Sequence, residues 1–387
     1  MRYRTLLLLF VLPVAGAEYP PLYLSSWGST GTSAGQFNLP TAIALSPSGS
    51  VYVADRDNHR IEVFDPSGAF QFQWGANKLL APVALAIDLS GFVYVCDRDA
   101  NLIFKFDGSG AHVLHWGSLG TQPGQFRYPM GIDVDPSGKV YVVDSNNDRI
   151  QKFDSSGHFL SQFGTFGSGP GQLSTPLDIN ARCCSLYVAD WGNNRIQKFD
   201  YSGTFLQQWG ALGSGNGQFN HPEGVTADVL GAVYVFDAWN CRIQKFDADG
   251  TFLTTWGTFG TAPGQFNTTT DGALDNTGIM YAVDWRNNRI QKFGLCALSI
   301  TQATYSGGVL SLGFRLGFSQ PGYTWFGELG TPSGGLRLWS ELEPRLAPPI
   351  PRSLSIPITI PPGRATLYTK VVSTVGSTIC ETSAGIN

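Results

Sequence analysis

The chain has 387 residues, of which 42% are hydrophobic and only 14% are charged. This composition excludes a wholly disordered protein, and the length allows two or three domains. The 25 Lys and Arg residues against 29 Asp and Glu residues give a net charge of -4, so the chain lacks the broad positive field that neutralises a phosphate backbone. We therefore expect no nucleic-acid partner. The 47 Gly and 23 Pro residues favour many short strands joined by tight turns.

The first segment, residues 1–17, has the pattern of a secretory signal peptide. Two arginines precede an apolar run from Leu6 to Val14, and three small residues end the segment at Ala17. The apolar run is shorter than the roughly 20 residues that a transmembrane helix needs, and no later run reaches that length. We expect cleavage after Ala17 and a secreted, monomeric protein without a transmembrane segment.

The second segment, residues 18–294, carries a sequence repeat. Its central element is clearest in VYVVDSNNDRIQKFD at 140–154. The first Asp of this element recurs at intervals of 42, 47, 46, 47 and 47 residues, at positions 55, 97, 144, 190, 237 and 284. Each repeat holds four alternating apolar runs between turn residues, and four strands in about 45 residues predict one blade of a β-propeller.

The number of blades follows from a second marker, an aromatic residue followed by Gly. This pair ends the outermost strand of the first five repeats but is missing from the sixth, and an extra copy, Trp27-Gly28, precedes the first repeat. We therefore predict six blades, with the N-terminal strand completing the sixth. Such a closure pairs edge strands that an open ring would expose.

The repeat resembles the NHL repeat, most fully at 124–154 and 217–247, where Gly-Gln-Phe and a Pro-x-Gly element accompany the central element. The resemblance implies an all-β, six-bladed β-propeller of the NHL type. It implies no single activity, because one fold hosts many functions. Propellers of this kind include secreted binding domains, RNA-binding tripartite-motif proteins and the amidating lyase.

The repeated Asp and the Arg five positions later have a structural role in our interpretation, because a pair present in nearly every blade solves a problem that the blades share. We expect the Asp to accept backbone N–H bonds in its turn, and the Arg to bridge to this Asp or to a neighbouring blade. The second repeat has Leu102 instead of this Arg and lacks the Gly-Gln-Phe linker, so we expect an irregular rim there. The pattern predicts no catalytic residues.

Candidate binding residues lie where the blades differ on one face. In propellers of this kind, the loop entering the innermost strand and the loop after the repeated Asp open on the same face. The second loop has Arg56, Arg98 and Ser145 in the first three blades but a tryptophan in the last three, where the first loop is acidic. We predict a ligand site formed by Trp191, Trp239, Trp285, Asp178, Glu223, Asp271 and His221. In the alternative interpretation, the tryptophans only cover neighbouring loops.

The third segment, residues 295–387, lacks the repeat and predicts a small β-sandwich. It holds seven alternating apolar runs, at 298–305, 309–318, 323–329, 335–341, 354–360, 366–373 and 377–381. Cys296 and Cys380 lie near its two ends, and we expect a disulfide between them. We expect an adhesive or structural accessory domain.

Two functions fit these features. We favour an exported, non-enzymatic binding or scaffold protein whose propeller face holds a carbohydrate, peptide or protein partner. The alternative is a metal-dependent lyase or hydrolase with its site in the central channel. Resemblance to the amidating lyase implies several histidine ligands, but only His221 lies at such a loop. The carboxylates of Asp178, Glu223 and Asp271 suit Ca²⁺ better than Zn²⁺, so we expect no cofactor apart from a candidate Ca²⁺ in the channel.

Overall fold

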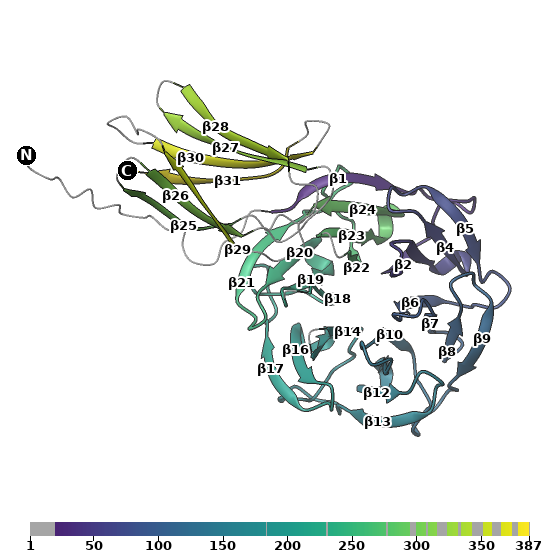
Figure 1. Cartoon of the computed structure of the whole chain (residues 1–387). Helices are drawn as coiled ribbons and strands as arrows, with labels where there is room; N and C mark the ends of the chain where they lie inside the picture. The colour runs from purple at the N-terminus through teal and green to yellow at the C-terminus, as the bar shows by residue number, and fades with distance from the viewer. Residues whose placement is uncertain are drawn as a thin grey trace, which may run out of the picture. The chain divides into compact units, whose positions relative to one another are not determined.

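The computed structural model describes residues 20–294, except 183, 230, 276 and 277, and after Gly294 it describes the backbone of seven strands. Residues Tyr23–Asp275 and Ile279–Phe293 form one compact unit. In this unit, six four-stranded sheets are arranged around a central axis as a six-bladed β-propeller (Figure 1). None of the described residues forms a helix that is long and apolar enough to cross a membrane.

The four strands of each blade are arranged side by side, from an innermost strand at the centre of the ring to an outermost strand at its circumference. The innermost strands are β2 (Pro40–Leu45), β6 (Pro82–Ile87), β10 (Pro129–Val134), β14 (Asp178–Arg182), β18 (Pro222–Ala227) and β22 (Thr269–Leu274). The second strands are β3 (Val51–Asp55), β7 (Val93–Asp97), β11 (Val140–Asp144), β15 (Ser185–Asp190), β19 (Val233–Asp237) and β23 (Ile279–Asp284). The third strands are β4 (Arg60–Phe64), β8 (Leu102–Phe106), β12 (Arg149–Phe153), β16 (Arg195–Asp200), β20 (Arg242–Phe246) and β24 (Arg289–Gly294). The outermost strands are β5 (Phe70–Trp74), β9 (His112–Trp116), β13 (Phe159–Phe163), β17 (Phe205–Trp209), β21 (Phe252–Trp256) and β1 (Leu22–Trp27).

The hydrophobic core of the propeller lies between blades. The second and third strands are buried along most of their length, because a neighbouring blade packs on each side. Ile61 of the first blade packs in the same cluster as Val95 of the second, and equivalent clusters fill other boundaries between blades. Burial of each such side chain stabilises the fold by about 1.5–3 kcal/mol. Each blade therefore needs its neighbours.

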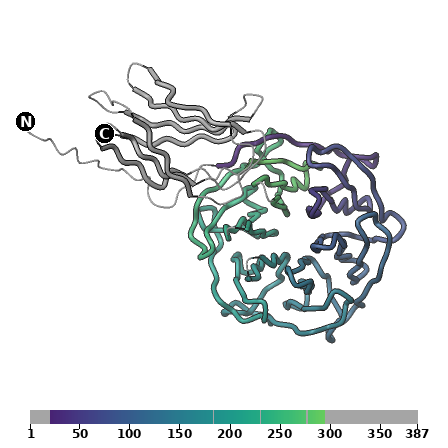
Figure 2. Tube along the Cα trace, in the orientation of Figure 1, coloured from purple at the N-terminus to yellow at the C-terminus, as the bar shows by residue number. Residues whose placement is uncertain are grey.

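The ring closes through the N-terminal strand, as the sequence predicts. The sixth sheet has the order β1-β24-β23-β22, so strands from the two ends of the propeller sequence are hydrogen-bonded neighbours. Figure 2 shows the start of the described chain beside the end of the repeats. Trp27 lies at the boundary with the first blade, 5.8 Å from Phe64 and 6.1 Å from Tyr281 between ring centroids. Gly68 packs against this indole, and a side chain at position 68 would clash with it, because a Cβ there would lie 2.7 Å from Trp27.

The repeated Asp and Arg hold the linker that enters each blade, which confirms their structural role. In the third blade, Asp144 accepts bonds from the Arg149 Nε and the Arg127 backbone N–H, each at 2.7 Å. The Arg149 guanidinium also donates to the carbonyls of Gln122 and Gln125 at 3.0 Å. The backbone N–H that Asp144 accepts comes from the linker and not, as expected, from its own turn. The turn contributes a side-chain donor instead, because Asn147 donates its amide to Asp144 at 2.8 Å.

A second set of contacts ties the blades together through the lysine of the third strand. Lys152 Nζ donates at 2.8 Å to the carbonyl of Tyr201 in the next blade and lies 5.1 Å from the Tyr141 ring centroid. Lys292 makes the same contact across the closure, donating to the carbonyl of Pro66 at 2.9 Å. These bonds join each donor blade to the outer turn of its neighbour.

The second blade departs from this arrangement, as the sequence predicts. Its linker has seven residues between Trp74 and Pro82 (75–81), whereas the first blade has twelve between Trp27 and Pro40 (28–39). Of the repeated Asp and Arg, only the Asp bonds this linker, because the second blade lacks the Arg. Asp97 accepts the backbone N–H groups of linker residues 80 and 81 at 2.7 and 3.0 Å. The shorter linker leaves this part of the rim less filled.

The segment after Gly294 belongs to a second compact unit. Its seven strands are β25 (Ser299–Ser306), β26 (Val309–Arg315), β27 (Tyr323–Thr331), β28 (Gly334–Leu342), β29 (Pro351–Pro357), β30 (Ala365–Ser373) and β31 (Thr378–Ile386). They form a three-stranded sheet, β25-β26-β29, and a four-stranded sheet, β28-β27-β30-β31. The predicted Cys296–Cys380 disulfide lies outside the described side chains.

Glu62 of the first blade occupies a position that is Gln in the last four blades. Gln151 donates to the Gln125 carbonyl at 2.7 Å and to Asp144 at 3.0 Å, and it accepts the Gly124 N–H at 2.8 Å. Glu62 keeps the accepting bond, because its Oε1 accepts the Gly35 N–H. An ionised Glu62 cannot make the two donating bonds, and its buried Oε2 has no partner. Burial raises the pKa of Glu62 to about 7 despite the nearby Arg60. The protonated carboxyl would restore the missing donor.

We predict that the closing strand is essential for the stability of the whole ring. A chain that begins at residue 31 loses β1 and exposes the edge of β24, so its melting temperature should fall by about 10 °C or more. Trp27→Ala should have a milder effect of roughly 3 kcal/mol. A chain that begins at residue 20 is the matched control and should melt like the full chain. Equal melting temperatures for the two truncated chains would contradict the closure.

Glu62→Gln should increase the free energy of unfolding at pH 8 by about 2 kcal/mol, because the amide supplies the missing donor at every pH. The folded-state pKa of Glu62 is raised, so the contribution of Glu62 to stability is fully present at low pH and is lost as the pH rises from about 4.5 to about 7. The difference between variant and wild type should therefore vanish near pH 4 in urea titrations. Gln151→Glu should introduce the same loss of stability with rising pH into the third blade. Parallel stability profiles for wild type and Glu62→Gln would refute this interpretation.

Candidate functional site

Two sets of loops come together on one face of the ring, as the sequence predicts. In each blade, a backbone N–H in the turn after the second strand donates to a carbonyl of the linker that enters the innermost strand. The Trp285 N–H bonds the Thr268 carbonyl at 3.0 Å, and the Trp239 N–H bonds the Asn220 carbonyl at 3.2 Å. We call the surface formed by these turns and linkers the loop face.

Short 3-10 helices position the candidate aromatic residues on the loop face. These helices are η1 (Arg56–Asn58), η2 (Ser145–Asn147), η3 (Trp191–Asn193), η4 (Ala238–Asn240) and η5 (Trp285–Asn287). The residue after η3, Asn194, has a left-handed backbone with φ of 54°, which Asn tolerates better than most residues. Its side-chain oxygen accepts the His221 N–H of the next blade at 2.8 Å. The turn of one blade is thus fixed to the linker of the next.

Trp191, His221 and Trp239 pack as one contiguous group of tilted rings, which we call the aromatic cluster. The His221 ring centroid lies 4.2 Å from that of Trp191 and 4.2 Å from that of Trp239. His221 Nδ1 also lies 2.8 Å from Asn220 Oδ1. Burial lowers the pKa of His221, so its ring is neutral at pH 7 and packs between the indoles without a charge. Trp239 remains 59% exposed, so the cluster presents one indole to solvent.

Trp285 lies in a separate group with two arginines. The guanidinium of Arg56 is 5.6 Å from the Trp285 ring centroid, and that of Arg286 is 4.9 Å away, both in the range of cation–π contacts. Arg56 of the first blade reaches Trp285 of the sixth because ring closure makes these two blades neighbours.

Glu223 belongs to this arginine group and not to the other acidic candidates. Burial raises its pKa to about 7, and the charges of Arg286 and Arg56 partly oppose that rise. The group therefore combines one indole, two guanidinium groups and one carboxyl that titrates near neutral pH. Arg286 was not among the candidates from sequence, although it directly follows Trp285 and could have been found from that position.

Asp178 and Asp271 lie along the inner strand edges, where they hold neighbouring blades together. Asp178 accepts the Val225 N–H at 2.8 Å, and Asp271 accepts the Ile43 N–H at 2.9 Å, in each case from the innermost strand of the next blade. Burial raises the pKa of Asp271 to about 7 and that of Asp178 well above its usual range, and the Asp271 charge adds to the effect on Asp178. These carboxyl groups therefore link the innermost strands of neighbouring blades.

The sequence interpretation missed Asp133, which has the same function one blade earlier. Its Oδ2 accepts the Ala181 N–H at 2.7 Å and the Asn180 amide at 3.1 Å, and burial raises its pKa to about 6. The alternation of β10 could have revealed it, because residues two apart in a strand share a face.

The described side chains do not fit the candidate Ca²⁺ site. Ca²⁺ takes six to eight oxygen ligands. Among the residues that the structure describes, no group of three or more His, Cys, Asp and Glu side chains is placed to hold a metal ion. Glu223 lies with Arg286 and Arg56, and the two aspartates accept backbone donors. We derive no chemistry from a metal in the channel.

Comparison with known proteins identifies the repeat. The family model of the NHL repeat matches residues 37–64, 126–153 and 219–246, which contain the first three strands of the first, third and fifth blades. The chain therefore contains NHL repeats that are arranged in a six-bladed β-propeller.

Similar curated proteins match only a short part of the chain. It is 38% identical over 66 residues to "Protein brain tumor" of Drosophila melanogaster and 44% identical over 52 residues to "B-box type zinc finger protein ncl-1" of Caenorhabditis elegans. These matches cover 15% and 13% of this chain and 6% of each relative. The relatives are thus much longer than the matched segments.

Solved structures share the fold over a larger part of the chain. A streptogramin B lyase and a catalytically inactive virginiamycin B lyase from Staphylococcus aureus with quinupristin each give a TM-score of 0.50 at 18% identity. The alignments cover 75% and 76% of this chain and 94% of each lyase. At this identity, the likeness shows a shared fold alone.

We predict opposite effects on stability for two substitutions of Asp271. Asp271→Asn keeps an oxygen for the Ile43 N–H and removes a buried charge close to Asp178, so the free energy of unfolding at pH 8 should rise by about 1 kcal/mol. Asp271→Leu leaves that N–H without its acceptor and should lower stability by about 1–3 kcal/mol. Because the pKa of Asp271 is raised, the gain from Asp271→Asn should disappear at pH 4 in denaturant titrations. A loss of stability for Asp271→Asn at pH 8 would show that the charge itself is required.

Proposed function

We propose that this protein is an exported, non-enzymatic binding protein whose loop face holds a peptide or protein partner. The aromatic cluster is the observation that carries the proposal. Trp239 is 59% exposed, yet it is packed on His221, which is packed on Trp191. A large indole that is already ordered loses little conformational freedom on binding. Such an indole offers a strong contact to a partner.

The residue types around the cluster favour a protein surface. Trp, Tyr and Arg are the residues that contribute most to binding energy at protein interfaces. On the loop face, Arg98 lies 5.7 Å from the ring centroid of the exposed Tyr128, and Arg56 and Arg286 flank Trp285. The loop face therefore offers aromatic and cationic contacts from several blades.

The geometry of the indoles favours a peptide over a carbohydrate. The planes of Trp191 and Trp239 stand at 81° to each other, with ring centroids 6.5 Å apart. A flat shelf for successive sugar rings would need nearly parallel indoles, whereas an angled pair accommodates an apolar side chain. With arginines nearby, we propose a partner segment that combines an apolar side chain with an acidic residue.

The lyase or hydrolase alternative has less support. The lyases with the same fold share 18% of the sequence, so their reaction does not transfer to this chain. The channel carboxylates that the alternative would use, Asp178 and Asp271, accept backbone N–H groups of neighbouring blades. Their contacts support a role in closing the ring.

A peptide-display experiment tests the proposal. A random 12-residue library would be selected on the wild-type protein, and the enriched peptides would be measured by biolayer interferometry. Trp239→Ala should weaken binding by roughly 30-fold, which corresponds to a hot-spot contribution of about 2 kcal/mol. Its melting temperature should stay within about 2 °C of the wild type, because surface substitutions usually cost under about 0.5 kcal/mol.

Leu206→Ala is the matched control, because Leu206 is an exposed apolar residue of the outermost strand β17, away from the loop face. It should leave peptide affinity unchanged. Equal binding by wild type and Trp239→Ala, or selection of peptides that Leu206→Ala fails to bind, would place the site elsewhere. Binding in a parallel glycan array without any enriched peptide would favour a carbohydrate partner and contradict the proposal.

A further inference from the structure

A pocket lies at the boundary between the first and second blades, away from the aromatic cluster. It has a volume of about 430 Å³, within the range of small-molecule sites. The shortened linker 75–81 borders it, together with the end of β5 and the start of β9. The five residues missing from this linker, relative to the first blade, leave the space open.

Two substitutions in β8 accompany the shorter linker. In the other five blades, an Arg at the start of the third strand donates to linker carbonyls, as Arg149 does to Gln125 at 3.0 Å. The second blade has Leu102 at this position and Phe104 where Gln151 lies in the third blade. A buried Arg or Gln without those carbonyls would have unsatisfied donors, which is costly. Apolar residues remove that cost and supply an apolar environment behind the pocket.

Aromatic rings line the pocket. The ring centroids of Trp74 and Phe106 are 4.4 Å apart, compared with 5.8 Å for the equivalent pair Trp27 and Phe64. Gly110 allows this position of the indole, because a Cβ on Gly110 would overlap Trp74. The two rings are tilted at 45° to each other, so they form an angled apolar surface against which one ring of a ligand can pack.

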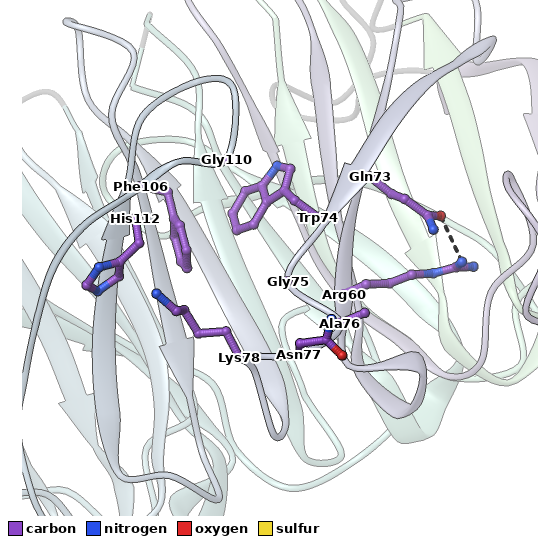
Figure 3. A pocket seen from close by; sticks show the side chains of 10 residues that line it. All are labelled: Arg60, Gln73, Trp74, Gly75, Ala76, Asn77, Lys78, Phe106, Gly110 and His112. Atoms are coloured by element: carbon purple, nitrogen blue, oxygen red, sulfur yellow. Dashed lines mark hydrogen bonds between the residues drawn. The ribbon is translucent and has the colours of Figure 1, made fainter.

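The ionisable residues of the pocket are all of the basic type, and its other polar residues, Gln73 and Asn77, are neutral. Arg60, Lys78 and His112 line it, and no carboxylate does. Arg60 is already committed, because its guanidinium bonds Asp55, Gln73 and linker carbonyls. Lys78 is exposed, and its ammonium has no hydrogen-bond or ion-pair partner among the described residues. Figure 3 shows its amine directed toward Phe106 and His112.

His112 adds a neutral donor beside this amine. Desolvation, the Lys78 charge and His115 hold the pKa of His112 below its ordinary value, so the imidazole is uncharged at pH 7. Its Nε2 lies 3.3 Å from His115 Nδ1, which makes the two imidazoles a hydrogen-bonded pair. An unpaired ammonium, a neutral imidazole and an aromatic surface therefore meet in one pocket.

We propose that this pocket binds a small organic anion in which a carboxylate is attached to a six-membered or fused ring. The ring packs against Trp74 and Phe106, and the carboxylate pairs with the Lys78 ammonium next to His112. An aromatic acid and a sugar acid share this chemistry. The pocket is a second binding site, independent of the peptide site proposed on the loop face.

Calorimetric titration of the full chain tests the proposal with three probes: indole-3-acetate, the neutral indole-3-acetamide, and D-glucuronate. At least one of the two carboxylates should bind saturably with a dissociation constant below about 1 mM. Where indole-3-acetate binds, indole-3-acetamide should bind at least about tenfold more weakly. Tighter binding of indole-3-acetate identifies an aromatic acid as the source, and tighter binding of D-glucuronate identifies a sugar acid.

Lys78→Gln should weaken carboxylate binding by at least about tenfold, and Lys78→Arg should retain it. Lys78 is exposed, so neither change should affect folding, which a melting curve checks. Lys139→Gln, in the turn between β10 and β11, is the matched control and should bind like the wild type. Equal binding of indole-3-acetate and its amide, unchanged affinity in Lys78→Gln, or no saturable binding of either carboxylate up to about 10 mM would overturn the proposal.

Discussion

A buried carboxylate at the end of each second strand is the interaction on which the propeller depends. The six aspartates, at 55, 97, 144, 190, 237 and 284, are fully buried. A buried charge costs several kcal/mol unless donors surround it, and here the donors come from the turn, the linker and, in five blades, the Arg. The requirement for donors therefore orders the linker. An ordered linker fixes the loop face, on which Trp191 and Trp239 are held from adjacent blades.

The second blade shows that the parts of this network depend on one another. Its linker is shorter, and the Arg and the Gln that would bond the missing carbonyls are replaced by Leu102 and Phe104. Glu62 shows the opposite case, in which the linker is complete but one donor is lost, and its Oε2 remains buried without a partner. Loss of the loop together with its donors opens a pocket, whereas loss of a single donor makes stability depend on pH.

The repeat made most of the fold predictable, because every strand of a blade recurs with its turn residues and because Trp27-Gly28 marks the missing outermost strand. The candidate site was less predictable. Position in a blade correctly brings Trp191, His221 and Trp239 to one face, since the same loops open there in every blade. It does not show that Arg56 lies beside Trp285, which requires the ring to be closed in space. It also does not separate Glu223 from Asp178 and Asp271, because a shift of one residue along an inner strand changes which neighbour a side chain contacts.

The closure by β1 has a consequence for synthesis of the chain. β1 leaves the ribosome first, but its partner β24 follows about 260 residues later, which takes about 15–50 s at the usual rates of translation. During this interval the strand has an unpaired edge of the kind that joins foreign strands. The blades in between can pack one after another as they emerge, yet the ring gains its last sheet only when both ends meet. The nascent ring therefore stays open until β24 has been synthesised. Until then, the edge of β1 is available for pairing with strands of other chains.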